Sequence, residues 1–415
     1  MNNKSITFSE ATKSSRKSFT TLVKPVGSSC NLACDYCYYA DKAALYQNST
    51  PCMSLSLLET YIRQFCQSVD VPEITFCWHG GEPLLAGIDF YRHALRLQRR
   101  YAGGRKIVNT IQTNGTLVDD QWCRLFADND FLVGLSLDGP EDIHDGARRN
   151  KAGAPTFARV MRAVELFVRH GVEFNTLSVV SRLSEGRGVE TYDFLRAAGS
   201  RYMQFLPAVE HLSAEGRIVS PFDAGGSPAP WSVSAEGFGR FMTDIFDKWV
   251  THDVGSYFVQ LFDVALAQWV GVNPGLCAFS KSCGDGLAVE HNGDVYACDH
   301  FVYPEYRLGN ITEGHLSDMY VSRSQFLFGM AKRSGLAEEC TRCRYYFACT
   351  GGCPKHRFGG DSEHHGKNAL CRGYYLFFDH VAPYMARMAD LLRSGREASG
   401  VMEWAKSRIA AKNEV

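Results

Sequence analysis

The sequence lacks three features that would place it at a membrane or on a polyanion. It contains no run of about 18 apolar residues, so we expect no transmembrane helix. The N-terminal stretch MNNKSITFSEATKSSRKSFTT is polar and has no apolar core of a secretory signal peptide. Lysines and arginines number 44 against 45 acids, a formal net charge of -1. This balance argues against general binding to nucleic acid or anionic membranes.

Cysteine, in contrast, is abundant, with fifteen residues. An odd number in close-set groups, without a secretion signal, favours metal binding over disulfides. We therefore expect a cytoplasmic metalloprotein. The hydrophobic content of 45% and charged content of 21% are ordinary for a globular chain, and 415 residues favour two or three domains.

Short apolar runs alternate with amphipathic helical stretches through the first half of the chain. The runs cover residues 19–25, 73–79, 106–115, 131–140, 172–180 and 201–209. Such alternation predicts a parallel sheet, and six units suit a barrel or partial barrel. Because barrel chemistry sits on loops after the carboxyl ends of strands, a cysteine loop, GGEP, QTNG and SLDGP should converge on one pocket.

One helical stretch, TFARVMRAVELFVRHG, illustrates the pattern. Apolar residues at helical spacing predict one buried face, with Gly171 as the stop. The predicted face comprises Phe157, Val160, Val164, Phe167 and Val168.

The first cysteine group has the spacing Cys30-x3-Cys34-x2-Cys37. Three thiolates can hold a [4Fe–4S] cluster whose fourth iron keeps an open position. A zinc site completed by a distant ligand, or three buried free cysteines, would fit the spacing too.

The wider stretch CNLACDYCYYADK, with Tyr36 before the third cysteine, resembles the signature of radical S-adenosylmethionine (SAM) enzymes. GGEP, from Gly80 to Pro83, is the second mark of that family. The resemblance implies an α/β fold, a partial (β/α)6 TIM-like barrel. It also implies that SAM chelates the open iron and yields a 5′-deoxyadenosyl radical when it receives an electron.

The same resemblance implies contacts to SAM. Tyr36 and Val209 would line the adenosine. Gly81, which has no Cβ, would let the backbone approach the methionine ammonium, with Glu82 as a complementary charge.

Two further SAM contacts are implied. Ser136 would hydrogen-bond the ribose or carboxylate, and Arg148 would pair with the carboxylate through its planar fork. Each of these three residues also has an alternative interpretation without a ligand: Ser136 would be a turn residue, Arg148 a solvated charge and Val209 a core side chain.

Eight cysteines follow later in the chain, the number needed for two four-cysteine sites. Two zinc ribbons are the physical alternative. The region resembles the SPASM extension of radical SAM peptide-modifying enzymes, which implies two auxiliary [4Fe–4S] clusters for electron transfer. The implied ligands are Cys277, Cys283, Cys298 and Cys353 for the first cluster, and Cys340, Cys343, Cys349 and Cys371 for the second. The remaining Cys52, Cys66, Cys77 and Cys123 are expected to be buried small hydrophobes.

Several stretches, among them IQTNGTLVDDQW, FLVGLSLDGPEDIHD and CDHFVYPEYRLGNI, are similar to anaerobic sulfatase-maturating enzymes. This resemblance implies two-electron oxidation of a Cys or Ser in a C/S-x-P/A-x-R motif to Cα-formylglycine. Asp299, directly after Cys298, would be the base that removes the substrate proton. The alternative is that Asp299 is a turn residue whose side chain caps a backbone amide.

The implied partners are an unfolded or nascent sulfatase and an electron donor such as flavodoxin or ferredoxin, without nucleic acid or membrane. Two other functions stay open at this point: another SPASM-type peptide maturase that forms crosslinks, and a non-catalytic zinc-binding regulator. The expected segments are a flexible tail (1–18), the barrel (19–235), bridging helices (236–270), the SPASM domain (271–375) and a helical tail (376–415).

Overall fold

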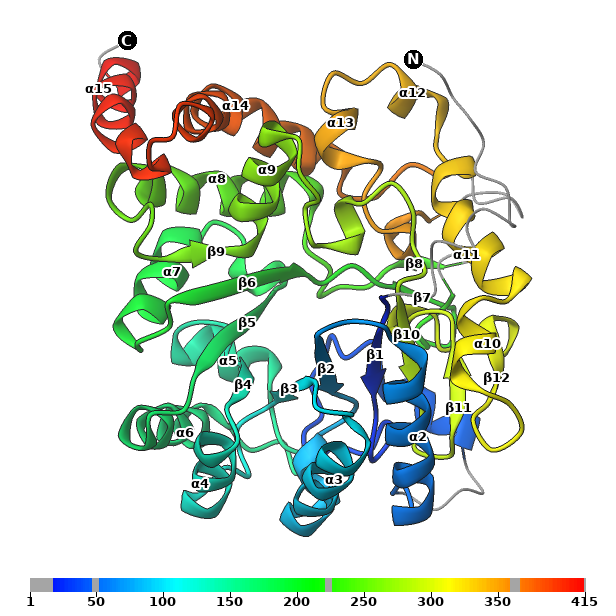
Figure 1. Ribbon diagram of the computed structural model, residues 1–415. Coiled ribbons are helices and arrows are strands. Elements are labelled where there is room, and N and C mark those ends of the chain that lie inside the picture. The colour runs from blue at the N-terminus through cyan, green and yellow to red at the C-terminus, as the bar shows by residue number, and fades with distance from the viewer. Residues whose placement is uncertain (1–17, 47–51, 221–225, 359–365, 414–415) are drawn as a thin grey trace.

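The computed structural model describes residues 18–46, 52–220, 226–358 and 366–413. Its centre is a ten-stranded sheet in the order β12-β11-β10-β1-β2-β3-β4-β5-β6-β9 (Figure 1). The strands are β1 (Thr20–Val23), β2 (Glu73–Trp78), β3 (Lys106–Thr113), β4 (Phe131–Ser136), β5 (Phe174–Val180), β6 (Tyr202–Pro207), β9 (Phe258–Val259), β10 (Gly286–Val289), β11 (Asp294–Tyr296) and β12 (Arg307–Asn310).

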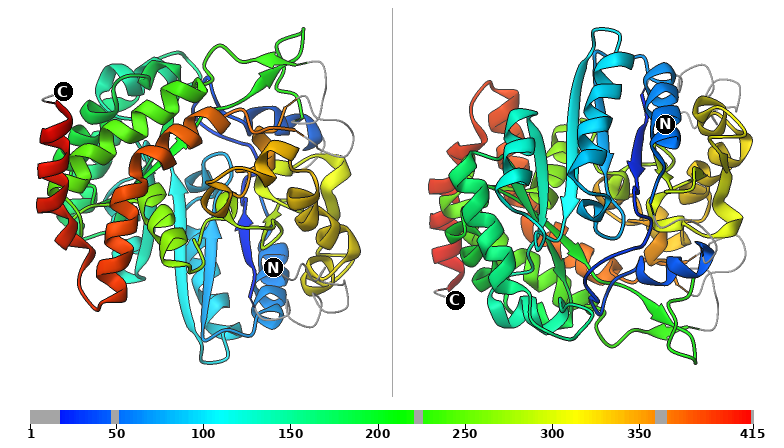
Figure 2. Two further views of the ribbon diagram at one scale, coloured as in Figure 1. Left: turned by 90° about the horizontal axis from the view of Figure 1, so that it is seen from above. Right: turned by 90° about the horizontal axis from the view of Figure 1, so that it is seen from below.

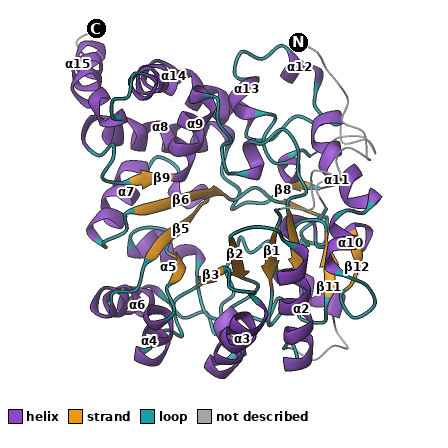
Figure 3. Ribbon diagram, viewed as in Figure 1, coloured by secondary structure: helices purple, strands orange, loops and turns teal. Residues whose placement is uncertain are grey.

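Strands β1 to β6 lie side by side in chain order and are all parallel. Helices alternate with them and cover the outer side of the curved sheet (Figures 1 and 3). These helices are α2 (Leu55–Ser68), α3 (Ile88–Tyr101), α4 (Asp120–Asp128), α5 (Glu141–Ala147), α6 (Phe157–His170) and α7 (Gly188–Ala197). The predicted partial barrel is confirmed.

Helix α6 ends where predicted, because Gly171 takes the left-handed conformation (φ 65°) that closes the last turn. Val160, Val164 and Phe167 are buried. Val168 is 65% exposed, so its place on the predicted buried face is wrong. It follows Phe167 by one residue, about 100° around the helix, which carries it past the edge of the apolar stripe.

The cysteine-rich part extends the barrel sheet instead of forming a separate layer. Strand β10 pairs in parallel with β1, with Leu22 opposite Ala288. Strands β11 and β12 then continue the sheet as an antiparallel ribbon. The small helices of this part are α10 (Leu316–Tyr320), α11 (Arg323–Ser334), α12 (Glu338–Thr341) and α13 (Tyr346–Cys349).

A layer of helices packs against α7 and against the β6–β9 edge of the sheet. Within this layer, α14 and α15 lie along α8 (Figure 2). Gly239 and Gly373 let α8 and α14 approach closely, because a Cβ on Gly239 would lie 2.8 Å from the Gly373 carbonyl oxygen. Helix α14 contains Pro383 and runs through the expected domain boundary at residue 375. The layer comprises α8 (Ala235–His252), α9 (Gln260–Val270), α14 (Cys371–Arg393) and α15 (Met402–Asn413).

The Gly-, Ser- and Pro-rich stretch after β6 contributes a small ribbon of β7 (His211–Leu212) and β8 (Ser227–Pro228). Short 3₁₀ turns occur at Ala40–Tyr46, Pro83–Ala86, Arg182–Ser184, Cys277–Phe279, Asp299–Phe301, Pro304–Tyr306, Pro354–His356 and Ala398–Val401. Within the described residues, no helix is long and apolar enough to cross a membrane. The expected flexible tail falls outside the described residues, except for Ser18.

Candidate functional site

The first cysteine group lies on the loop that leaves β1. Backbone bonds from Ala33 N to the Arg149 carbonyl (2.8 Å) and from Asp35 N to the Ala147 carbonyl (3.1 Å) fix this loop against the end of α5. The three thiols are close enough to act on one another electrostatically. The pKa of Cys34 is raised to about 12, chiefly by burial; the Cys37 and Cys30 thiols contribute to the rise and Arg148 opposes it.

The GGEP loop packs directly on the cysteine loop. The Gly81 N–H donates to the Gly27 carbonyl at 2.7 Å, and the Glu82 N–H donates to the Ser29 carbonyl at 2.8 Å. A Cβ on Gly81 would lie 2.0 Å from the Ser29 carbonyl oxygen. The contact between the two loops therefore requires glycine here, whether or not a ligand is bound.

Glu82 is fully buried, and both carboxylate oxygens accept hydrogen bonds. One oxygen accepts from Leu84 N (3.0 Å) and the Thr113 hydroxyl (2.8 Å), and the other from Asn114 N (2.8 Å). Burial raises the pKa of Glu82 to about 7, although these hydrogen bonds oppose the shift. The side chain joins the GGEP loop to the end of β3.

Arg148 lies against the carboxylate of Asp138, which belongs to the SLDGP loop after β4. Its Nε and Nη2 donate to the two Asp138 oxygens at 2.9 and 3.1 Å. Asp138 also accepts from the Tyr36 hydroxyl and from Val179 N. Arg148 is buried and ion-paired, in contrast to the solvated charge considered as its alternative.

Ser136 and Val209 are buried near the same end of the sheet. The Ser136 hydroxyl accepts a hydrogen bond from Gln112 Nε2 at 3.1 Å. Val209 belongs to the main hydrophobic core, whereas Tyr36 packs in a separate small cluster with Ala147 and Ala208. The structure therefore brings together Tyr36, Arg148 and the cysteine loop, and places Val209 in a different cluster.

The eight later cysteines fall into two groups by the thiols that act on one another. Cys283 and Cys298 each interact with Cys277 and Cys353. Cys349 interacts with Cys340, Cys343 and Cys371. These groups coincide with the two interleaved ligand sets implied by the family resemblance, which we name set one (Cys277, Cys283, Cys298, Cys353) and set two (Cys340, Cys343, Cys349, Cys371).

The donor chemistry of all three groups fits iron–sulfur clusters. The pKa of Cys283 and of Cys349 is raised to about 12, chiefly by burial, with a contribution from neighbouring thiols. Adjacent buried thiolates are therefore unfavourable unless a metal supplies positive charge, as cluster irons do. Of the remaining cysteines, Cys66 and Cys123 are buried as predicted, whereas Cys52 and Cys77 are only partly buried.

Asp299 is brought to the mouth of the barrel, beside the first cysteine loop. One carboxylate oxygen forms an ion pair with Lys24, at the end of β1, and the other accepts from the hydroxyl of Tyr38, which follows Cys37. Burial opposes ionisation, but the Lys24 ammonium holds the pKa of Asp299 well below its usual range.

Lys24, Tyr38 and His79 complete this neighbourhood. Lys24 and Tyr38 were not predicted from the sequence, whereas His79 was expected to face the pocket without an assigned role. The Gly80 N–H donates to His79 Nδ1 at 2.8 Å, so the neutral ring carries its proton on Nε2. Burial and Lys24 lower the pKa of His79 to about 4. A lysine that ends an apolar strand just before a cysteine motif was the available sequence signal for Lys24.

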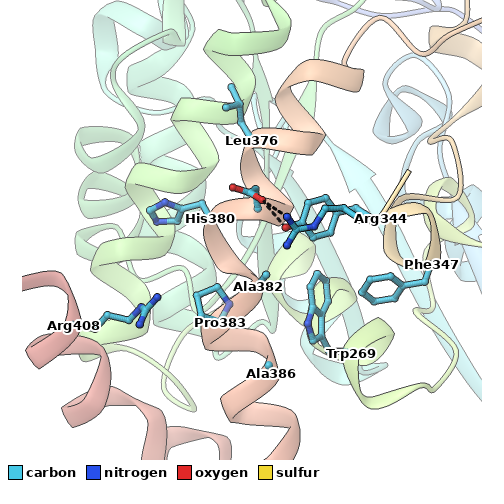
Figure 4. A pocket seen from close by; sticks show the side chains of 11 residues that line it. Trp269, Arg344, Phe347, Leu376, His380, Ala382, Pro383, Ala386 and Arg408 are labelled. Carbon is cyan, nitrogen blue, oxygen red and sulfur yellow. Dashed lines mark hydrogen bonds and ion pairs between the residues drawn. The ribbon is translucent and has the colours of Figure 1, made fainter. Parts of the chain in front are cut away.

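A wide cleft of about 900 Å³ lies elsewhere, between α9, α13, α14 and α15 (Figure 4). Trp269, Phe347 and Pro383 line it, and Arg344 pairs with Asp379 at 3.6 Å. None of the predicted site residues lines this cleft. The chemistry proposed for the cysteine loops is therefore not located there.

Comparisons with known proteins agree with this arrangement. Residues 25–195 match the Radical SAM superfamily, and residues 277–344 match SPASM, an iron–sulfur cluster-binding domain. The cofactors are thus SAM, a [4Fe–4S] cluster and auxiliary iron–sulfur clusters.

Individual relatives match over nearly their whole length. A serine-type anaerobic sulfatase-maturating enzyme of Bacteroides thetaiotaomicron is 45% identical, covering 93% of this chain and 95% of its own. A cysteine-type enzyme of Clostridium perfringens is 31% identical over 90% of this chain and 98% of its own. A solved structure of native anSMEcpe with bound AdoMet and Cp18Cys peptide superposes with a TM-score of 0.81 at 30% identity, covering 90% and 99% of the two chains. The chain belongs to the anaerobic sulfatase-maturating enzymes of the radical SAM superfamily.

Proposed function

We propose that this protein oxidises a Cys or Ser side chain in a C/S-x-P/A-x-R motif of a sulfatase to Cα-formylglycine. The names of its relatives and the peptide bound in a related structure support this reaction class. The observation that carries the proposal is the position of Asp299. It follows a cysteine of set one and lies beside Tyr38 and Lys24 of the barrel, next to the first cysteine loop.

When bound, SAM and the cluster at Cys30, Cys34 and Cys37 supply the radical that removes a hydrogen atom from the substrate Cβ. Asp299 accepts the proton of the substrate thiol or hydroxyl, because it is ionised and adjoins that loop. Lys24 and Tyr38 hold its two oxygens in place. Cysteine sets one and two hold the auxiliary clusters that carry away the remaining electron.

The SAM contacts stay a proposal at six positions: Tyr36, Gly81, Glu82, Ser136, Arg148 and Val209. Their surroundings suggest distinct tasks. Gly81 and Glu82 shape the loop that faces the first cysteines, through contacts with Ser29 and Asn114. Arg148 and Tyr36 act together through Asp138. A SAM carboxylate would therefore share the Arg148 guanidinium with Asp138.

We further propose that the substrate is an unfolded or nascent sulfatase in the cytoplasm, and that an electron donor such as flavodoxin or ferredoxin supplies the first electron. The motif must reach a base that is only 8% exposed, which an extended peptide does more readily than a folded domain.

The test is anaerobic turnover of two short peptides that differ only in Cys or Ser at the reacting position. Mass spectrometry should detect the aldehyde from at least one peptide, together with 5′-deoxyadenosine. A peptide with Ala at that position serves as the control and should yield no aldehyde. Deoxyadenosine without aldehyde from either peptide would reject the proposed reaction.

A further inference from the structure

Two buried cations lie among the later cysteines without a carboxylate partner among the described residues. They are Arg357 and Lys332, each 1% exposed. Taking a charge out of water costs several kcal/mol unless an opposite charge compensates it. A buried arginine and a buried lysine so close together therefore require an anion that the carboxylates of the described chain do not supply.

Among the described residues, only neutral carbonyl groups accept hydrogen bonds from the guanidinium of Arg357. Its Nη1 donates to the carbonyls of Lys332 (2.8 Å) and Gly335 (3.1 Å), and its Nη2 donates to the carbonyl of Gly351 (3.3 Å). A Cβ on Gly351 would lie 2.8 Å from Nη2, so this glycine makes room for the guanidinium. These contacts fix the charge in position but do not neutralise it.

The cysteines that act most strongly on Arg357 come from both auxiliary sets. Cys283 and Cys353 belong to set one, and Cys340 and Cys349 belong to set two. Arg357 thus lies within electrostatic range of both groups of four.

Lys332 differs from Arg357 in the cysteines that act on it. The thiols that act most strongly on it are Cys283, Cys353 and Cys277, all of set one. Its ammonium donates to the carbonyls of Cys277 (2.7 Å) and Ala278 (2.8 Å). The two cations therefore divide the sets: one lies near both and the other near set one.

We propose that Arg357 is a counter-cation shared by the two auxiliary clusters, that Lys332 serves the set-one cluster alone, and that the two residues set the reduction potentials of these clusters. The inference rests on the proposed assignment of sets one and two as cluster ligands. Reduction adds one electron, and so one negative charge, to a cluster already made anionic by four thiolates. A fixed cation in a low-dielectric interior favours that reduced state, and cluster net charge is a known determinant of potential.

A purely structural role makes a different prediction. Arg357 also ties down carbonyls at the end of α11, where a cation is favourable. If that were its whole task, its replacement would lower stability and leave the potentials of correctly loaded clusters unchanged.

The experiment is an anaerobic redox titration of the full-length, reconstituted enzyme, followed by electron paramagnetic resonance. The first cluster is identified by the response of its spectrum to SAM, because only it has an open iron. The variants are Arg357→Gln, Arg357→Lys and Lys332→Gln. Arg342→Gln is the matched control, because Arg342 is next to Cys343 but its side chain is 76% exposed. Iron and sulfide are counted for every sample.

Arg357→Gln should shift both auxiliary potentials to more negative values, and Lys332→Gln should shift only one of them. Arg357→Lys should stay close to wild type, and Arg342→Gln should change neither, because water screens its charge. The first cluster should not move in any variant. If Arg357→Gln loses iron, the one-cluster shift in Lys332→Gln together with wild-type potentials in Arg357→Lys supports the proposal.

Unchanged auxiliary potentials in fully loaded Arg357→Gln and Lys332→Gln would overturn the inference, as would equal shifts in Arg342→Gln. These results would leave the proposed reaction intact, since the peptide assay measures it separately. Absence of sulfide-containing auxiliary clusters from the wild-type enzyme would instead reject the ligand assignment itself.

Discussion

Asp299 is held at both oxygens, by the ammonium of Lys24 and by the hydroxyl of Tyr38. This pairing keeps a buried carboxylate charged, and it aims the carboxylate at the loop that carries the first cysteines. The pair joins the first strand of the barrel to the SPASM part. Its partners lie 275 positions apart in the sequence, so no local pattern could have revealed it.

Replacement of the proposed base should separate the two halves of the reaction. We expect Asp299→Asn to keep SAM cleavage but to lower aldehyde formation by roughly 10²-fold or more, the usual contribution of a general base. Both products are measured in the same anaerobic assay. Asp318→Asn, an exposed acid on α10, is the control and should match wild type. Full aldehyde yield from Asp299→Asn would exclude the base role.

Lys24→Met should be strongly destabilising, because it leaves the Asp299 carboxylate buried without its cation. The expected loss is about 3–5 kcal/mol in the free energy of unfolding. The double variant Lys24→Met/Asp299→Asn should recover most of that loss, since no unpaired charge remains. Anaerobic urea unfolding of the loaded enzyme measures all three variants. Losses that simply add in the double variant would show that the two side chains are not coupled.

At the scale of elements, the loops after β1 and β2 form one unit. Two backbone hydrogen bonds connect them, and Gly81 lies against the Ser29 carbonyl. The cysteine spacing therefore positions only part of the first site. The GGEP loop supplies the surface on which the cysteine loop rests.

Gly81→Ala should consequently displace the cysteine loop. We expect the purified, reconstituted variant to lack about four irons, the content of the first cluster, while both auxiliary clusters assemble. Gly314→Ala is a suitable control, because its added Cβ would meet only the Met319 methyl at 3.5 Å. Wild-type iron content and SAM cleavage in Gly81→Ala would contradict the packing argument.

The six parallel strands of the barrel could be predicted because each apolar run ends in turn residues and alternates with a helix, whereas β9 to β12 were not predicted. The exposure of a residue at the edge of a helix's apolar face could not be predicted in this way, as Val168 shows.

Within the site, the sequence indicated that Tyr36, Arg148 and the cysteine loop gather, but neither that Lys24 and Tyr38 join Asp299 nor how the side chains pair. Arg148 and Glu82 were expected to meet a ligand, whereas the structure engages them with Asp138 and with the end of β3. Such pairing depends on distances across the sheet, which local pattern does not encode.

At the scale of the whole molecule, the two auxiliary ligand sets are interleaved along the chain. Cys353 belongs to set one although it lies between Cys349 and Cys371 of set two in the sequence. The polypeptide thus passes from one cluster to the other and back.

This interleaving gives a discriminating prediction. Cys353→Ala should remove the same auxiliary signal as Cys283→Ala, whereas Cys371→Ala should remove the other. Electron paramagnetic resonance of the three reduced variants makes the comparison, and Cys123→Ala, a buried cysteine outside all sets, is the control. Matching spectra from Cys353→Ala and Cys371→Ala would show that the assignment is wrong.

The pairing of β1 with β10 also bears on how the protein is made. During synthesis, β1 to β6 leave the ribosome before β10, which begins at residue 286. Until β10 pairs with it, this side of β1 is an unpaired sheet edge, and such edges promote aggregation. Asp299 and Lys24 remain apart until β10 arrives. An unfinished chain that ends before Asp299 therefore contains all three ligands of its first cluster but lacks the proposed proton acceptor.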